Sequence, residues 1–250
     1  MLKQSEVRFM KRIFKQLIVL VAGMFWISTA HGQNSNSSSQ KFGKHFTISA
    51  YLNPEITAPV KSLEEGMRTY GFGHTRPRDC FFFFCIPETD FPKTYSDLTW
   101  MGKITYHHHP NYGLSLLYSV DKFGETVGYS SSVGKLGIEH EMQSISTQLT
   151  IGLYDIISLS AGPSLHTLRI KESSFVSYEK SRKLGADMDL TLRFPKKSLF
   201  FVSADIHYKW AGNYSVGPYS KSLNNSTVTF QETKVNYNHL TVAYGFGVRF

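Results

Sequence analysis

Apolar and polar residues alternate along most of the chain after residue 43. A period of two is the pattern of β-strands whose two faces lie in different surroundings. Eight segments show it, and the predicted strands are residues 44–53, 98–107, 112–120, 144–153, 157–166, 183–194, 199–210 and 238–250. One face of each is aliphatic and aromatic, and the other carries small polar and charged side chains. The sequence therefore predicts an all-β fold.

Short and long connections alternate between these strands. The links near 108–111, 154–156 and 195–198 are very short, whereas the links 54–97, 121–143, 168–182 and 211–237 are long. This sorting is typical of a transmembrane barrel, with turns on the periplasmic side and loops outside. The pattern predicts an eight-stranded antiparallel up-and-down transmembrane β-barrel over residues 44–250, with short periplasmic turns and long outer loops.

Periodicity alone leaves a second barrel open, because a soluble lipocalin-like barrel would turn the charged face outward and the apolar face inward. Two features favour the membrane. Small residues dominate the polar face, as a narrow lumen requires, and aromatic residues lie toward the strand ends, as in interfacial girdles. These aromatic residues are Trp100, Tyr106, Tyr112, Tyr118, Tyr208, Trp210 and Phe250. A periplasmic lipocalin-like carrier remains the alternative.

The N-terminus has the three parts of a secretory signal. A basic region ends at Lys15, an apolar stretch covers Leu17–Ile27, and the small residues Ala30 and Gly32 precede Gln33. The stretch is shorter than the roughly 20 residues that span a bilayer as a helix. We therefore expect residues 1–32 to be cleaved as a signal peptide and residues 33–43 to form a linker. The sequence does not decide between two start codons, Met1 and Met10, because a signal beginning at Met10 would also be complete.

The charge of the chain does not indicate nucleic-acid binding. The formal net charge is +8, but five basic residues lie in the predicted signal. After residue 32 the chain holds 22 basic and 18 acidic residues without a long basic run, so no phosphate-facing patch is expected. Aromatic residues make up 14% and charged residues 18% of the chain, which argues against disorder.

The last predicted strand ends the chain on an aromatic residue. Its apolar face carries Tyr244, Phe246, Val248 and Phe250 without a break, and in this it resembles the C-terminal strand of bacterial outer-membrane proteins. The chain is similar in pattern to the small OmpA-like or OmpW-like outer-membrane β-barrel group. The resemblance implies the outer membrane of a Gram-negative cell, contact with its lipid, and recognition of the strand ending at Phe250 by the barrel-assembly machinery. It does not define an activity, because such barrels serve as anchors, adhesins, narrow channels and enzymes.

Cys80 and Cys85 are the only two cysteines, and both lie in the longest predicted loop. Export would place them in an oxidising compartment, so we expect a local disulfide. It would hold Phe81–Phe84 in a compact loop tip. That tip would form an exposed contact surface or fold against the barrel and its loops.

Seven ionisable residues on the polar faces form a predicted lumenal charge network. They are Lys103, Asp187, Asp189, Asp205, His207, Lys209 and Arg249. If the strands before and after 195–198 pair through that turn, Asp187 lies near His207 and Asp189 near Asp205, within one register step. One interpretation is an ion-pair plug that closes a narrow barrel. The other is an acid/base or Ser-His-Asp site of a lipid hydrolase, for which lumenal side chains are badly placed to meet lipid.

No catalytic, cofactor or metal site is predicted. The run His107–His109 does not make a metal site, because neighbouring strand residues point to opposite faces and Pro110 begins a turn. We expect a non-enzymatic outer-membrane protein that acts as an anchor or interaction surface through its outer loops, whose partner the sequence does not name. A narrow channel for small solutes or hydrophobic molecules is the second hypothesis. A lipid-modifying acyl hydrolase, which would need His207 or His239, is the third.

Overall fold

The computed structural model describes residues 45–53, 60–76, 79–81, 84–86, 89–95, 97–109, 111–154, 156–173, 178–195 and 198–250. The predicted signal peptide, 1–32, and linker, 33–43, lie outside these residues. Within the described ranges, no helix is long and apolar enough to cross a membrane.

Strands make up most of the described chain. The barrel strands are β1 (His45–Asn53), β5 (Thr99–His109), β6 (Tyr112–Ser130), β7 (Gly134–Tyr154), β8 (Ile157–Glu172), β9 (Glu179–Phe194), β10 (Phe200–Trp210) and β15 (His239–Arg249). The elements between them are α2 (Val60–Thr69), β2 (Asp79–Phe81), β3 (Phe84–Ile86), β4 (Lys93–Tyr95), β11 (Asn213–Val216), β12 (Tyr219–Leu223), β13 (Ser226–Phe230) and β14 (Thr233–Asn236).

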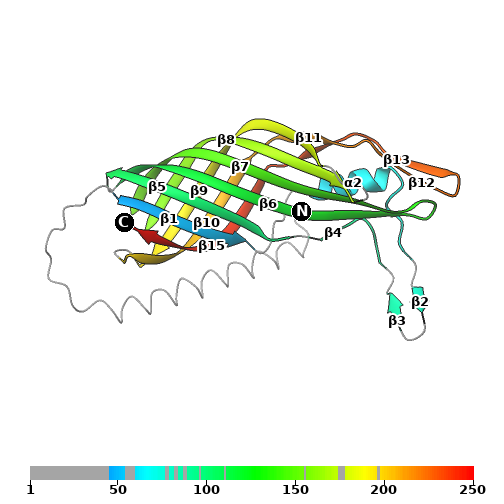
Figure 1. The fold of residues 1–250 in the computed structure, drawn as a ribbon, viewed down its shortest axis with the longest axis horizontal. Coiled ribbons are helices and arrows are strands. Elements are labelled where there is room, and N and C mark those ends of the chain that lie inside the picture. The colour runs from blue at the N-terminus through cyan, green and yellow to red at the C-terminus, as the bar shows by residue number, and fades with distance from the viewer. Residues whose placement is uncertain are drawn as a thin grey trace, which may run out of the picture. The chain divides into compact units, whose positions relative to one another are not determined.

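The barrel strands form a closed antiparallel ring. Their order is β6-β5-β1-β15-β10-β9-β8-β7, and pairing of β6 with β7 closes it. The first and last strands lie side by side, with Ile48 opposite Val248 and Ala50 opposite Phe246. Short turns lie at the end where β1 begins and β15 ends, and α2, β12 and β13 lie at the other end (Figure 1). The predicted eight-stranded up-and-down barrel is confirmed.

The segments predicted as long loops contain much regular structure, which corrects that prediction. The links 121–143 and 168–182 consist mainly of continued strand, since β6 runs to Ser130 and β7 begins at Gly134. The link 211–237 holds the strand pairs β11–β14 and β12–β13, and β4 in the link 54–97 pairs with β6. The barrel wall therefore continues beyond the predicted strands as an outer half.

Local sequence explains how these outer hairpins turn. Asn224 and Asn225 join β12 to β13 with φ angles of 47° and 62°, values that suit a two-residue hairpin and that asparagine tolerates better than most residues. Between β6 and β7, Gly134 follows the turn at 131–133 with a φ of 78°. Both turns return the chain into an antiparallel strand.

The helix α2 covers the inside of the outer half. Leu63 and Met67 stand four residues apart, on one face of the helix, and both are fully buried against the apolar cluster of the outer half. Lys61, Glu65 and Arg68 on the other faces are exposed. The helix therefore follows the amphipathic pattern of a surface helix.

Candidate functional site

The strands of the ring expose apolar side chains and bury polar ones. We call the exposed apolar belt the lipid-facing band. It contains Phe46, Ile48, Leu52, Leu98, Trp100, Ile104, Tyr112, Leu114, Leu116, Ile145, Leu149, Ile151, Leu153, Leu165, Leu184, Met188, Phe200, Val202, Tyr208, Trp210, Leu240, Phe246 and Phe250. Water would not favour this arrangement, because burying the apolar face is what stabilises a soluble fold.

Two lysine–aspartate pairs cross the lumen inside this band and tie strands that are not neighbours. Lys103 on β5 forms an ion pair with Asp189 on β9 and donates a hydrogen bond to Ser160 on β8 at 2.8 Å. Lys209 on β10 forms an ion pair with Asp121 on β6. All four charged side chains are buried, so each charge has its partner inside the barrel, as burial requires.

Hydroxyl groups and histidines fill the space around these pairs. A hydroxyl chain joins Thr105 to Ser115 at 2.9 Å and Thr150 to Ser160 at 3.0 Å. Thr191 donates to the Oδ2 of Asp205 at 2.6 Å. The remaining contacts of the network are His166 Nε2 to Asp187 Oδ1 at 3.7 Å, His207 Nε2 to Asp187 Oδ2 at 3.9 Å and His239 Nε2 to Asp121 Oδ2 at 3.6 Å.

The end of the lumen where β1 begins and β15 ends carries two arginines around one ring. The guanidinium carbons of Arg193 and Arg249 lie 5.9 Å and 5.8 Å from the centroid of Phe201. These distances suit cation–π contacts. The phenyl ring and the guanidinium groups together occupy this level of the barrel.

Above the charged network, the inside of the barrel becomes apolar. We call this cluster the outer cap. It contains Leu63, Met67, Phe72, Phe123, Val133, Leu136, Ile138, Met142, Leu168, Ile170, Ala211, Tyr214, Val216, Tyr219, Phe230, Val235 and Tyr237. The aromatic ring of Phe123 at its base stacks on His140, with 5.4 Å between centroids, and meets Tyr237 edge to face at 5.4 Å.

Burial sets the ionisation of the polar groups in the outer cap, because desolvation disfavours their charged forms. It lowers the pKa of His140 to about 3 and raises the pKa of Tyr214 to about 12. The pKa of Tyr237 is raised further. All three groups are therefore neutral near pH 7, and the base of the outer cap carries no charge of its own.

The barrel has a polar, ion-paired interior and an apolar outer belt with aromatic rims. A closed β-sheet needs this arrangement in order to cross the hydrocarbon of a membrane. The chain is a membrane-spanning β-barrel of the outer-membrane type. Its charged lumen does not fit the lipocalin-like carrier, which would keep an apolar interior.

No protein-family model and no curated protein matches the sequence. The fold resembles those of solved outer-membrane proteins. Ail, the attachment invasion locus protein of Yersinia pestis, is 14% identical, with 84% of this chain and 100% of Ail covered and a TM-score of 0.40. Neisserial surface protein A is 10% identical over 83% and 96% of the two chains, with a TM-score of 0.41. The outer membrane protein AlkL is 13% identical over 87% and 97%, with a TM-score of 0.43.

The structure places the seven residues of the predicted charge network inside the barrel. Six are buried, and Arg249 is half-buried at the end of the barrel where β15 ends. The pairing of β9 with β10 sets His207 opposite Asp189 and Lys209 opposite Asp187, one register step from the predicted neighbours. The predicted network lacked Asp121, His166, His239 and Arg193. Asp121 continues the alternation of Ser115 and Ser119, which was the signal available for it.

The barrel protein has elements of a Ser-His-Asp site, but they are enclosed. Ser144 Oγ lies 2.9 Å from Nδ1 of His166, and Ser164 Oγ lies 2.7 Å from its Nε2. His166 and Asp187 have side chains that are 0% exposed, so a lipid substrate does not reach them in this conformation. Among the described residues, no group of three or more His, Cys, Asp and Glu side chains could hold a metal ion.

The two cysteines lie on neighbouring strands. Cys80 on β2 stands opposite Cys85 on β3 in a short antiparallel pair. Their side chains, and residues 82 and 83 between the strands, lie outside the described part of the chain. The disulfide and the compact Phe81–Phe84 tip stay predictions.

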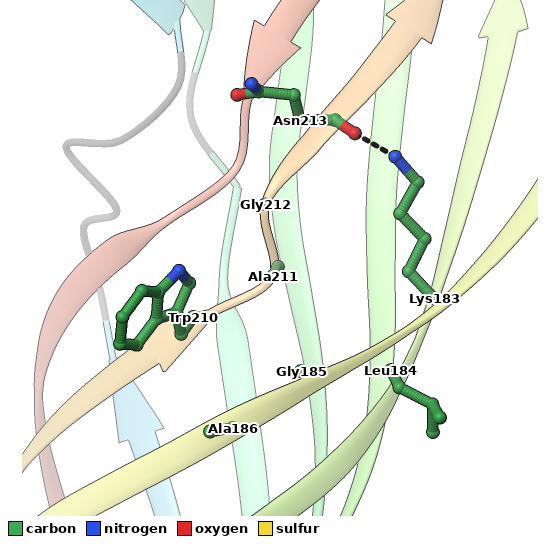
Figure 2. Close-up of a pocket in the computed structure, with 8 residues that line it drawn as sticks. All are labelled: Lys183, Leu184, Gly185, Ala186, Trp210, Ala211, Gly212 and Asn213. Carbon is green, nitrogen blue, oxygen red and sulfur yellow. Dashed lines mark hydrogen bonds between the residues drawn. The ribbon is translucent and has the colours of Figure 1, made fainter.

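A pocket lies at a gap in the barrel wall, which we call the wall gap. It is lined by Lys183–Ala186 of β9 and by Trp210–Asn213, where β10 passes into β11, and its volume is about 300 Å³. Lys183 crosses it to donate a hydrogen bond to the backbone carbonyl of Asn213 (Figure 2). The gap lies in the barrel wall at the upper rim of the lipid-facing band.

Proposed function

We propose that this protein is a non-enzymatic component of a Gram-negative outer membrane, whose barrel is a closed anchor and whose outer half is an interaction surface. The observation that carries the proposal is the lumen. Two ion pairs cross it, and the outer cap covers it with packed apolar side chains. A continuous aqueous path would have to pass both layers, and paired buried charges are costly to separate.

The outer half supports the second part of the proposal. It contains ordered strands and a helix around an apolar core of its own, whereas a barrel that served only as an anchor would need no more than short loops. Surfaces held by a rigid scaffold are the usual place of binding function. We further propose that the strand ending at Phe250 is read by the barrel-assembly machinery, as its resemblance to outer-membrane proteins implies.

Conductance in planar bilayers tests the closed barrel. We expect the refolded protein to be electrically silent. A variant that combines Phe123→Ala and Tyr237→Ala with Lys103→Ala and Asp189→Ala should show flickering openings, because it removes the base of the outer cap and one of the two ion pairs. Steady single-channel conductance of the unmodified protein would contradict the proposal and favour the narrow channel.

Labelling of intact cells tests which end is outside. A cysteine in place of Asn224, at the tip of the β12–β13 hairpin, should react with a membrane-impermeant maleimide. The matched cysteine at Ser198, in a short turn at the opposite end, should react only after the outer membrane is permeabilised. The reverse pattern would show that the predicted orientation is wrong.

A further inference from the structure

The wall gap exists because two neighbouring strands separate. Pairing of β9 with β10 ends at Ala186 opposite Trp210. The chain then turns away at Gly212, whose φ of 79° is in the left-handed region that glycine tolerates. It continues as β11, which pairs with β14. Among the described pairings, the part of β9 before Ala186 has a ladder only with β8.

The gap opens where the lipid-facing band ends. Leu184 and Trp210 at its lower rim are 84% and 63% exposed, and Leu184 pairs with Leu165, another residue of the band. Unpaired backbone groups cannot face hydrocarbon without a large cost. The free edge of β9 above Leu184 therefore lies at the level of the lipid headgroups.

The side chains around the gap carry surplus positive charge. Lys180 and Arg182 lie on the outward face of β9 directly above Leu184, and Lys183 lines the pocket. Among the described residues, none of the three forms an ion pair. The Nζ of Lys183 instead donates a hydrogen bond to the backbone carbonyl of Asn213, and it lies 4.7 Å from the ring centroid of Tyr214.

The acidic residues nearby are already engaged. Glu141 lies 3.6 Å from Arg169, and Glu139 lies 3.6 Å from Lys171, both on β8. Glu179 accepts a hydrogen bond from the hydroxyl group of Tyr219. Glu139 and Glu141 are thus paired with basic residues of β8, and the single carboxylate of Glu179 does not balance the three basic residues of β9.

Small residues form the floor of the gap. They are Gly185, Ala186, Ala211 and Gly212, and a Cβ at Gly185 would clash with the backbone oxygen of Trp210, so the strands approach closely there. The donors that a ligand would meet are therefore the ammonium group of Lys183 and the guanidinium and ammonium groups of Arg182 and Lys180. Such groups suit a phosphate oxygen.

We propose that the wall gap binds the phosphate group of an anionic lipid in the outer leaflet. Lys183 contacts the phosphate in place of the Asn213 carbonyl, with Arg182 and Lys180 beside it, and the acyl chains lie along Leu184 and Trp210. This site goes beyond the proposed function, because it concerns the lipid around the barrel and not a partner of the outer half. Either could be wrong without the other.

Tryptophan quenching tests the site in the full chain. Trp26→Phe with Trp100→Phe leaves Trp210 at the gap, and Trp26→Phe with Trp210→Phe leaves Trp100 on β5 as the matched control. Each protein is placed in phosphatidylcholine nanodiscs with a small share of brominated phosphatidate or brominated phosphatidylcholine. We expect Trp210 to be quenched preferentially by the phosphatidate and Trp100 to be quenched equally by both lipids.

Charge variants connect the preference to the gap. Lys183→Gln and Arg182→Gln should each lower the preference at Trp210 about fivefold, since one basic residue at a membrane surface contributes about 1 kcal/mol. Lys122→Gln, on β6, should leave it unchanged. Heat-modifiability on a gel shows that each variant has folded.

Two outcomes would overturn the proposal. Equal quenching of Trp210 by the two brominated lipids would show that the gap does not select an anionic headgroup, since both lipids carry a phosphate group and only phosphatidate has a net negative charge. The same equal quenching, together with binding of inorganic phosphate that Lys183→Gln abolishes, would show that the site takes a free anion and not a lipid headgroup.

Discussion

The membrane-spanning half and the outer half of the barrel are built from the same strands with opposite polarity. On β6, Ser115 and Ser119 point inward and Leu114 and Leu116 outward, whereas higher on the same strand Phe123 points inward. The outward residues of the outer half are charged, and they include Lys122, Glu139, Glu141, Arg169, Lys171, Lys180 and Arg182. The alternation of apolar and polar residues continues along the strand. The apolar residues point outward in the membrane half and inward in the outer half, because the surroundings of the barrel change from lipid to water. The boundary is set by the solvent and not by a break in the strands.

The comparison predicts that removal of an inward charge in the membrane half lowers the unfolding free energy more than any other single change considered below. Lys103→Ala should destabilise the barrel by about 3–5 kcal/mol, because it leaves Asp189 buried without its partner. Removing both, with Lys103→Ala and Asp189→Ala, should cost less than the single change. Urea unfolding in lipid vesicles, followed by tryptophan fluorescence, measures both. A double variant that is less stable than the single one would show that Asp189 does not depend on Lys103.

An arginine substituted at an outward position should lower the unfolding free energy much more in the membrane half than in the outer half. At Leu149, in the lipid-facing band, it should cost about 2–4 kcal/mol, because the charge enters hydrocarbon. At Thr167, which is outward on β8 but above Leu165, it should cost close to nothing. The same unfolding measurement compares them. Equal costs at the two positions would place the boundary of the membrane elsewhere.

The membrane half could be predicted from the sequence because its surroundings are uniform along each strand. The eight strands follow from the alternation of apolar and polar residues, their antiparallel order from the sorting of short and long connections, and the inward face from its small residues and from the aromatic residues at the strand ends. The outer half could not, because its inward face is apolar where the inward face of the membrane half is polar. Phe123, Leu136 and Ile138 point inward there, so these segments do not continue the pattern of small polar inward residues that predicts the strands.

The sequence also did not predict which residues pair across the lumen. Alternation gives the face of Lys103 and Asp189, and a short turn gives the approximate register of β9 and β10. The partner of Lys103 depends instead on strand tilt and on the stagger of the closed ring, which relate β5 to β9 across the lumen. The pairing of Lys209 with Asp121 could not be predicted either, because Asp121 belongs to the link 121–143 that the sequence predicts as a loop.

Because His140 at the base of the outer cap is neutral when buried, the unfolding free energy of the protein depends on pH. The pKa of His140 is lowered to about 3 in the folded protein, so between that value and the unfolded value near 6.5 the unfolded chain binds more protons. The contribution of His140 to stability is therefore fully present above pH 6.5 and falls by about 1.4 kcal/mol for each pH unit below it, until the folded pKa of about 3 is reached. Thermal unfolding of the protein and of His140→Phe, which keeps a ring against Phe123, should show a smaller acid sensitivity in the variant. Equal sensitivity would assign it to other groups.

The smallest effect is expected for an ion pair on the outside of the outer half. Arg169 and Glu141 lie 3.6 Å apart with partly exposed side chains, and such pairs contribute about 0–1 kcal/mol. Arg169→Ala should therefore change the unfolding free energy far less than Lys103→Ala, although both break a lysine- or arginine-carboxylate pair. High salt should reduce the effect of Arg169→Ala and leave that of Lys103→Ala unchanged, because only the outer pair is screened. A salt-sensitive Lys103 pair would mean that water reaches the lumen, and the closed barrel would then have to be abandoned.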